Sequence, residues 1–229
     1  MLILSLIVAL AGILAASAQE QPGVMGINAV GYIKKTLPPG GKFVCMSIPL
    51  EDMATNVIVF GQTSVAQGAP AGSEAFFWDV DHQSWSGGSK GGKGWSVAVS
   101  NQVISVGEGF FLKGAGDAAS PVDVAIKGEV PSSATLQRAI PGSSAFGTLA
   151  NPYPSSFQFG TSSLARDAAV GSEAFFWDVD QQSWSGGSKG GKGWSVAVSN
   201  QMVDVAEGFF LKEAGSGKTW QTEKPYTWP

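Results

Sequence analysis

Cysteine and histidine are nearly absent from this sequence, with one of each among 229 residues. A single cysteine cannot close an intramolecular disulfide, so the fold must depend on packing, and the apolar surroundings of Cys45 indicate a buried thiol. Because His82 is the only histidine, the count excludes a histidine-rich zinc site. Acid–base and nucleophilic catalysis usually need a histidine or cysteine beside a partner. We therefore expect a protein that is not an enzyme.

Charged residues are also scarce, at 14% of the chain, and the net charge is −4. Lysines occur singly or in pairs and form no larger basic cluster. Binding to nucleic acid requires grouped cations that neutralise phosphates, so we expect no nucleic-acid partner. Glycine and tryptophan are abundant, with 31 and 8 residues. This composition favours an extracellular β-rich module.

No segment after the N-terminus carries an apolar stripe of helical period, whereas alternating segments are frequent. Trp95–Ser100 alternates strictly and predicts a strand with Trp95, Val97 and Val99 on one face. Ala75–Asp81 predicts a second strand, with Phe76, Trp78 and Val80 toward the core and Phe77, like Phe111 of a later strand, on the opposite side. Further strands are expected at Glu108–Lys113 and Val122–Lys127. The predicted fold is all-β, with sandwich-like or barrel-like units.

The N-terminus is typical of a secretory signal peptide. Leu2–Ala16 is apolar, Ala16-Ser17-Ala18 gives a small-x-small cleavage pattern, and polar residues follow. We expect residues 1–18 to be removed and the protein to be secreted, at the cell surface or periplasmic. No lysine or arginine precedes the apolar run, which leaves an uncleaved anchor as the alternative. The run is shorter than the ~20 residues of a spanning helix, so we expect no membrane span after cleavage.

A long internal duplication organises the rest of the chain. Gly72–Lys113 returns as Gly171–Lys212 at an offset of 99 residues, and only five of the 42 positions differ. Weaker similarity extends upstream, so each repeat covers roughly 95 residues and only two copies exist. We expect a first unit at 19–120, which ends in the glycine-rich linker Gly114–Ser120, a second unit at 121–215 and a C-terminal tail at 216–229. Two tandem domains and one pseudo-symmetric fold both fit this pattern.

Several short phrases carry a family resemblance. They are Asn28-Ala-Val-Gly-Tyr-Ile33, Leu37-Pro-Pro-Gly-Gly41, Ser47-Ile-Pro-Leu50 and Gly107-Glu-Gly-Phe-Phe-Leu112. With them the chain resembles uncharacterised exported β-domain proteins of environmental Gram-negative bacteria. The resemblance implies an exported β-fold and no known activity, so it supplies no catalytic residues. The second repeat departs from the pattern, because Ala206 replaces the first glycine of the last phrase.

The candidate ligand contacts are two equivalent tryptophans, Trp85 and Trp184, each within Ser-Trp-Ser-Gly-Gly. They lack apolar neighbours, so an exposed indole ring there could stack on a sugar. The alternative is a ring folded back over its own hairpin. We expect the polar rim of each site to be an aspartate and a lysine, namely Asp79, Asp178, Lys93 and Lys192.

The aspartates also form pairs two residues apart, Asp79 with Asp81 and Asp178 with Asp180. Such carboxylates face the same way on a strand and could help to bind Ca²⁺, the one cofactor the sequence suggests. They could also serve as acid and base in a glycosidase. The simplest interpretation is a solvated face that caps the adjoining turn.

Three functional hypotheses follow. The first is an extracellular binding or adhesion module with two equivalent sites, whose partner is a glycan or a surface or matrix component. The second is a structural subunit of a surface layer, filament or matrix that self-assembles by strand addition. The third, which has the least support, is a glycosidase-like enzyme.

Overall fold

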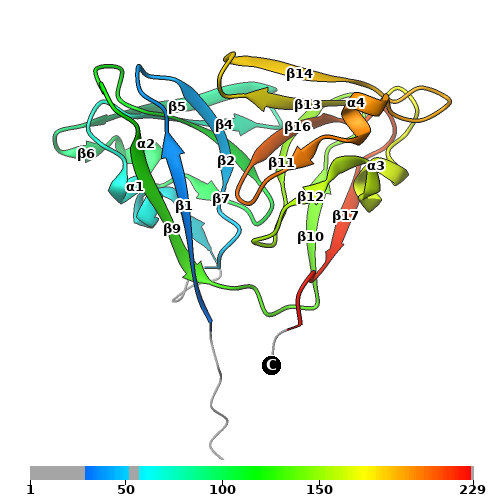
Figure 1. Cartoon of the computed structure of the whole chain (residues 1–229), viewed down its shortest axis with the longest axis horizontal. Helices are drawn as coiled ribbons and strands as arrows, with labels where there is room; N and C mark the ends of the chain where they lie inside the picture. The colour runs from blue at the N-terminus through cyan, green and yellow to red at the C-terminus, as the bar shows by residue number, and fades with distance from the viewer. Residues whose placement is uncertain (1–28, 52–56, 228–229) are drawn as a thin grey trace, which may run out of the picture.

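The computed structural model describes residues 29–51 and 57–227. As predicted, it is mostly β, with several antiparallel sheets, and no sheet among these residues closes into a barrel (Figure 1). The expected signal peptide lies outside the described residues. Within them, no helix has the length and apolarity needed to cross a membrane.

The first half of the molecule, residues 29–51 and 57–130, is built on one five-stranded sheet of order β2-β8-β4-β5-β6. Two pairs of strands, β1 with β9 and β3 with β7, complete the half, together with three short helices. The bounds are β1 Val30–Leu37, β2 Phe43–Ser47, β3 Ile58–Val59, η1 Phe60–Gln62, α1 Ser64–Gly68, β4 Glu74–Asp79, β5 Ser84–Gly91, β6 Gly94–Trp95, α2 Val97–Ser100, β7 Val103–Ile104, β8 Gly109–Lys113 and β9 Val122–Glu129.

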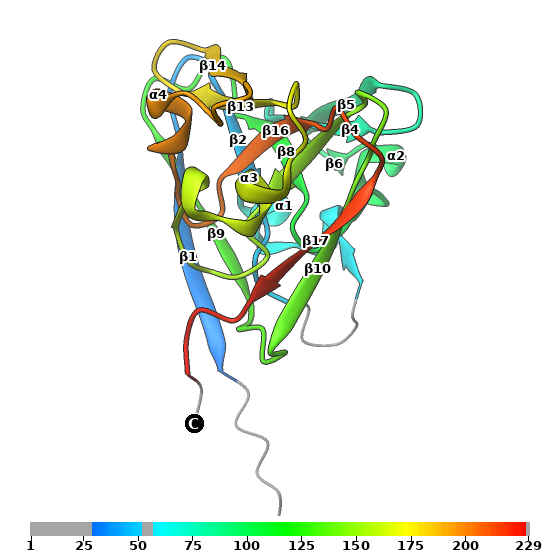
Figure 2. The same ribbon diagram turned by 90° about the vertical axis from the view of Figure 1, so that its right-hand side faces the viewer.

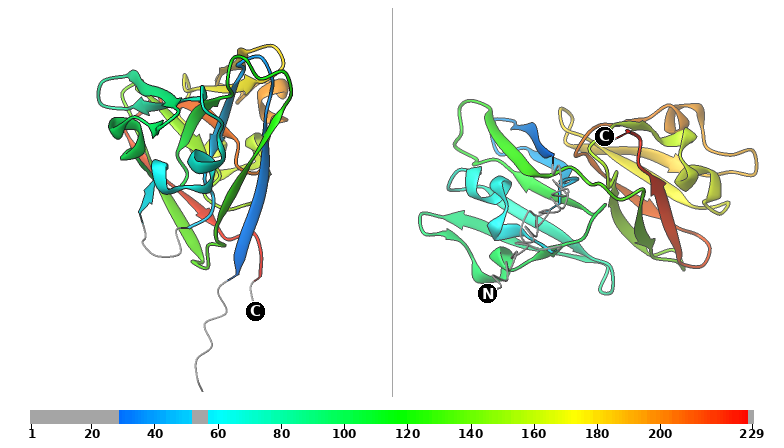
Figure 3. Two further views of the ribbon diagram at one scale, coloured as in Figure 1. Left: turned by 90° about the vertical axis from the view of Figure 1, so that its left-hand side faces the viewer. Right: turned by 90° about the horizontal axis from the view of Figure 1, so that it is seen from below.

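The second half, residues 131–227, lies beside the first (Figure 3, right) and repeats its arrangement with a four-stranded sheet of order β11-β16-β13-β14. Its paired strands are β10 with β17 and β12 with β15, and Figure 2 shows the β10–β17 ribbon descending along one side. The bounds are β10 Thr135–Ile140, β11 Phe146–Ala150, β12 Phe157–Gln158, η2 Phe159–Thr161, α3 Ser163–Asp167, β13 Glu173–Asp178, β14 Ser183–Ser188, α4 Val196–Ser199, β15 Met202–Val203, β16 Gly208–Lys212 and β17 Lys218–Glu223.

The strand pairing places the boundary between the two halves after β9, whereas we expected it at residue 120 from the sequence. Strand β9, expected to open the second unit, pairs along its whole length with β1, so that Leu37 lies opposite Val122 and Val30 opposite Glu129. Likewise β17, which falls in the expected tail, pairs with β10. Each half is therefore closed by a strand that follows the duplicated segment, and the repeat pattern alone could not reveal this pairing.

Trp95–Ser100 was predicted as a strand, and this prediction is wrong. Of these residues only Trp95 belongs to a strand, the two-residue β6, and after Ser96 the chain turns into α2. The Ser96 hydroxyl accepts a hydrogen bond from the Val99 backbone N–H, which is the usual way a serine begins a helix. Consequently Val99 is buried while Val97 is 76% exposed, so the two valines do not share a face.

The core of each half lies between the main sheet and the short helices. In the first half Phe77 and Phe110 point into this core with Phe60, and Phe176, Phe209 and Phe159 do so in the second. Phe77 was expected on the opposite side, so the facing of β4 was predicted the wrong way round. The Lys90 Nζ atom donates to three carbonyl oxygens at the end of α1, and Lys189 does the same at α3. These lysines satisfy carbonyls that a short helix leaves free.

Candidate functional site

The other face of each main sheet carries a layer of aromatic side chains, and these two layers meet between the halves. The shared cluster contains buried Cys45, Phe111 and Phe210 and partly buried Phe43, Phe76, Trp78, Phe146, Phe175 and Trp177. The buried thiol predicted for Cys45 is confirmed, and burial raises its pKa. The alternation of β4 explains the layer, because Phe76 and Trp78 must point away from the core that Phe77 enters.

Reciprocal hydrogen bonds hold the two layers together. The Trp78 Nε1–H donates to the Phe146 carbonyl oxygen, and the Trp177 Nε1–H donates to that of Phe43, both at 2.9 Å. Gln83 binds both the N–H and the carbonyl of Phe146 through its side-chain amide, and Gln182 binds those of Phe43 in the same way. Nothing in the sequence marked the two glutamines, because their partners lie 63 and 139 residues away.

Trp85 and Trp184 border the aromatic cluster where it opens to solvent. Their exposed fractions are 39% and 38%. Each ring makes tilted or edge-on contacts with both Phe111 and Phe210, at centroid distances of 5.0–5.6 Å. The two tryptophans therefore straddle the junction, and neither folds back only on its own hairpin.

Two pockets flank these tryptophans and share both rings. One has a volume of about 340 Å³ and the other about 310 Å³. The first is lined by Phe43, Phe76, Trp85, Phe111, Trp177 and Trp184, and the second by their counterparts Phe146, Phe175, Trp184, Phe210, Trp78 and Trp85. Because the pockets share their tryptophans, they form one continuous feature, which we call the aromatic cleft. The sequence predicted two equivalent sites but could not predict that they adjoin.

The predicted polar rim does not assemble at the aromatic cleft. Lys93 and Lys192 are exposed at hairpin tips, and Lys93 lies beyond Gly91, about 20 Å from Trp85 along β5. Asp79 ends β4, where alternation points it away from the face that carries Trp78. Its Oδ1 accepts hydrogen bonds from the N–H groups of Asp81 and His82, so this carboxylate fixes the turn.

The aspartate pairs do not form a cation cage in the described residues. Asp178 Oδ1 is engaged in its turn as Asp79 is, accepting from the N–H groups of Asp180 and Gln181. In the part of the chain that the structure describes, no three histidine, cysteine or acidic side chains are grouped closely enough to hold a metal ion. The capping role predicted as the simplest interpretation is the one the hydrogen bonds show.

Two lysine–glutamate pairs lie beside the aromatic cleft instead. Lys113 Nζ is 2.7 Å from Glu74 Oε1 and 5.5 Å from the centre of the Phe43 ring, which lines the first pocket. Lys212 is placed equivalently beside Glu173 and Phe146, at 2.8 Å and 5.4 Å. These partly exposed groups can exchange hydrogen bonds with a ligand that rests on the rings.

Charged side chains of opposite sign also influence each other across the junction. Arg138 Nη1 lies 3.4 Å from Glu108 Oε2, which joins the second half to the first. At the equivalent place, burial raises the pKa of Glu207 and lowers that of Lys35, although each favours the charged form of the other. These four side chains are partly buried where the two halves meet.

The aromatic cleft can therefore bind flat apolar surfaces, because its walls offer ring faces and edges and no ionisable side chain lines either pocket. Its lining residues lie in the two nearly identical segments 72–113 and 171–212, except for Phe43 and Phe146, which precede them. Comparison with protein-family models, with curated proteins and with solved structures yields no match for this chain.

Proposed function

We propose that the protein is an exported, non-catalytic binding module built from two pseudo-symmetric sandwich-like units. Its ligand site is the aromatic cleft at their junction, and its ligand is a carbohydrate. The observation that carries the proposal is the partial exposure of Trp85 and Trp184 beside two concave aromatic pockets. Export rests on the N-terminal sequence Leu2–Ala18.

The chemistry of the site supports an uncharged ligand with apolar faces. A pyranose ring presents C–H groups on its flat faces and hydroxyls around its edge. The faces can stack on Trp85 and Trp184, while the hydroxyls reach the Glu74–Lys113 and Glu173–Lys212 pairs. Each pocket lies at the lower end of the size range of small-molecule sites, roughly 300–1,000 Å³, and the two together lie well within it.

The shared tryptophans also favour one ligand chain across both pockets. Two sites on separate surfaces would raise avidity only on a multivalent target. Adjoining pockets allow consecutive rings of one oligosaccharide to bind side by side. An aromatic cleft preorganised by the Gln83 and Gln182 contacts loses little entropy on binding.

The test compares Trp85→Ala and Trp184→Ala with wild type by glycan array and polysaccharide pull-down, followed by calorimetry on the bound glycan. Each substitution removes a stacking surface worth about 1.5 kcal/mol, so we expect about a tenfold loss of affinity from each. Lys93→Ala and Val97→Ala are matched controls, since both residues are exposed and remote from the pockets. Retention of binding by the folded double tryptophan variant would contradict the proposal.

A further inference from the structure

The two pockets of the aromatic cleft are equivalent under exchange of the two halves of the molecule. Trp78 of the first half donates to a backbone carbonyl of the second, and Trp177 of the second half returns the contact to the first. Reciprocal contacts of this kind are typical of an approximate two-fold axis. The axis passes between the pockets, because Trp85 and Trp184, which both pockets share, exchange places under it. A ligand that fills both pockets must therefore present similar groups to opposite sides of these tryptophans.

Each pocket is lined by aromatic rings alone. Its six lining residues are all phenylalanine or tryptophan, so within the described part of the chain no side-chain oxygen lines either pocket. The indole N–H groups of Trp78 and Trp177 already donate to backbone carbonyls. A hydroxyl group that entered a pocket would lose its hydrogen bonds to water without replacement, which is unfavourable. The part of a sugar that enters a pocket must therefore be apolar, such as the methyl end of an acetyl group.

Polar groups beside the rings come from one lysine–glutamate pair in each half. In the five-stranded sheet Lys113 lies opposite Glu74, and two residues earlier Phe111 lies opposite Phe76. Side chains two residues apart on a strand share a face, so the pair lies on the face of the sheet that carries the rings. The second half repeats this register between β16 and β13. Each pocket therefore has a donor and an acceptor at its margin.

The chemistry of the pair matches that of an amide group. Lys113 Nζ donates one hydrogen bond to Glu74 Oε1, at 2.7 Å, which leaves the ammonium further N–H groups and the carboxylate further lone pairs. The two side chains are 25% and 31% exposed, so a ligand can reach them. An acetamido group has one N–H for the carboxylate and one carbonyl oxygen for the ammonium. Because the charges of the pair are opposite, this margin favours a neutral ligand over an ion.

We propose that the carbohydrate bound by the cleft is a β-1,4-linked polymer of N-acetylated hexosamine rings. The sugar faces stack on Trp85 and Trp184, each acetyl methyl enters a pocket, and each amide binds a lysine–glutamate pair. Consecutive rings of such a polymer are turned over relative to each other, so their acetamido groups point to opposite sides of the chain. The two pockets lie on opposite sides of the shared tryptophans in the same way. This ligand assignment rests on the proposed function, since it concerns the same site.

The main test uses the wild-type protein and three tetrasaccharides of the same linkage, built from N-acetylglucosamine, from glucose or from glucosamine. Calorimetry gives Kd for each ligand. A single methyl group in an apolar pocket changes affinity by about tenfold, so two acetyl groups should make the N-acetylated ligand bind about a hundredfold more tightly than the glucose ligand. The glucosamine ligand, which has ammonium groups in place of acetamido groups, should bind no better than the glucose ligand.

The outcomes separate this assignment from the proposed function. Equal affinity for the N-acetylated and glucose ligands would overturn the assignment and leave a carbohydrate function standing. Tightest binding of the glucosamine ligand would also overturn it, because the rings would then recognise a cation through their π faces. Binding of other array glycans but none of the three tetrasaccharides would have the same meaning. If no glycan binds, the assignment and the proposed function both fail.

Two variants test where the acetyl groups bind. Phe76→Ala and Phe175→Ala each remove one wall of one pocket. We expect each to lower the preference for the N-acetylated over the glucose ligand by about tenfold. Val97→Ala is the matched control and should keep the wild-type preference, since this residue is exposed and lines neither pocket. Circular dichroism reports folding, and leucine at both phenylalanine positions replaces alanine if alanine disturbs the fold. An unchanged preference in a folded double variant would overturn the placement of the acetyl groups.

Discussion

The two halves of the molecule adopt similar folds, and their contacts begin to differ where the duplicated segment ends. Within it, equivalent residues make equivalent contacts. Trp95 and Trp194 donate their indole N–H to Ala66 and Ala165, and the lysines at 90 and 189 cap the same helix ends. Both partners of each of these contacts lie in the same half.

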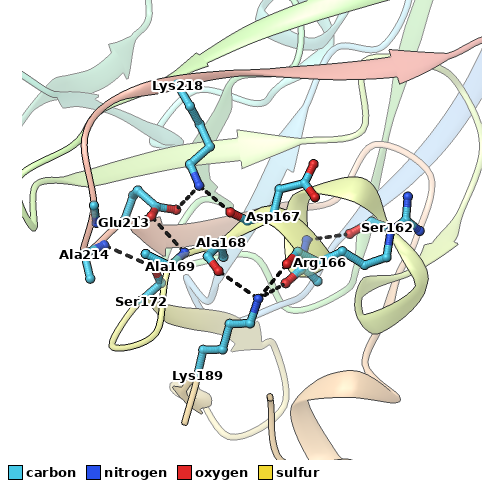
Figure 4. Close-up of polar contacts among 12 residues, drawn as sticks. Ser162, Arg166, Asp167, Ala168, Ala169, Ser172, Lys189, Glu213, Ala214 and Lys218 are labelled. Carbon is cyan, nitrogen blue, oxygen red and sulfur yellow. Dashed lines mark hydrogen bonds and ion pairs between the residues drawn. The ribbon is translucent and has the colours of Figure 1, made fainter. Parts of the chain in front are cut away.

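Directly after the duplicated segment, Gly114 of the first half is replaced by Glu213 in the second. The Glu213 side chain is fully buried, and Figure 4 shows it beside Lys218. Its Oε1 accepts hydrogen bonds from the N–H groups of Ala169 and Gly215, and its Oε2 lies 3.1 Å from Lys218 Nζ. In the first half this place is filled by backbone, because a Cβ on Gly114 would lie 3.1 Å from the Pro38 carbonyl oxygen.

The largest loss of stability is expected from Glu213→Ala, which removes the buried carboxylate that only the second half has. Burial raises the pKa of Glu213, but the hydrogen bonds from Ala169, Lys218 and Gly215 outweigh it and the net pKa is lowered. Removing the carboxylate leaves the partly buried N–H groups of Ala169 and Gly215 without their acceptor, and it leaves Lys218 with only the Asp167 carbonyl oxygen. We expect the free energy of unfolding to fall by about 3 kcal/mol, measured by urea denaturation.

Two comparisons sharpen that prediction. Glu173→Ala breaks a partly exposed pair in the same half and should cost less than about 1 kcal/mol. Because the pKa of Glu213 is lowered in the folded state, its contribution is complete above the ordinary carboxyl value of 4.5 and disappears as pH falls through the lowered value. The difference in the free energy of unfolding between wild type and Glu213→Ala should therefore become smaller in acid. A difference that grows in acid would contradict this account.

The sequence predicted the β class and the exposure of Trp85 and Trp184, because alternation and isolated polar surroundings are local signals. It predicted the wrong face of β4 for the core, since Phe76, Phe77 and Trp78 are all apolar and either facing fits the sequence. Nor did it show that Trp85 and Trp184 share one cleft. That proximity depends on the junction contacts of Gln83 and Gln182 with the opposite half, for which the sequence carries no local pattern.

A smaller effect is expected at the turn before β8 and β16, where Gly107 and Ala206 both have positive φ, 72° and 58°. An alanine in this region costs about 1 kcal/mol. Ala206 offsets this cost because its methyl group is buried against the first-half core, whereas a Cβ on Gly107 would lie 3.3 Å from the Ala150 carbonyl oxygen. We expect Gly107→Ala to destabilise by about 1 kcal/mol and Ala206→Gly to be within about 0.5 kcal/mol of wild type. Equal effects in thermal denaturation would show that the two turns are equivalent after all.

The smallest effect is expected at the one hairpin position where the copies differ, His82 against Gln181. His82 Nδ1 lies 2.9 Å from Asp79 Oδ2, and this hydrogen bond, with the aspartate charge, raises the pKa of His82 above 6.5. The added stability is complete below 6.5 and disappears as pH rises through the raised value, so His82→Gln should lower the melting temperature only in acid. Because the chain has one histidine, its NMR titration is unambiguous, and Asp79→Asn should return the midpoint toward 6.5. A wild-type midpoint at or below 6.5 would mean that this contact does not persist in solution and that the two hairpins behave alike.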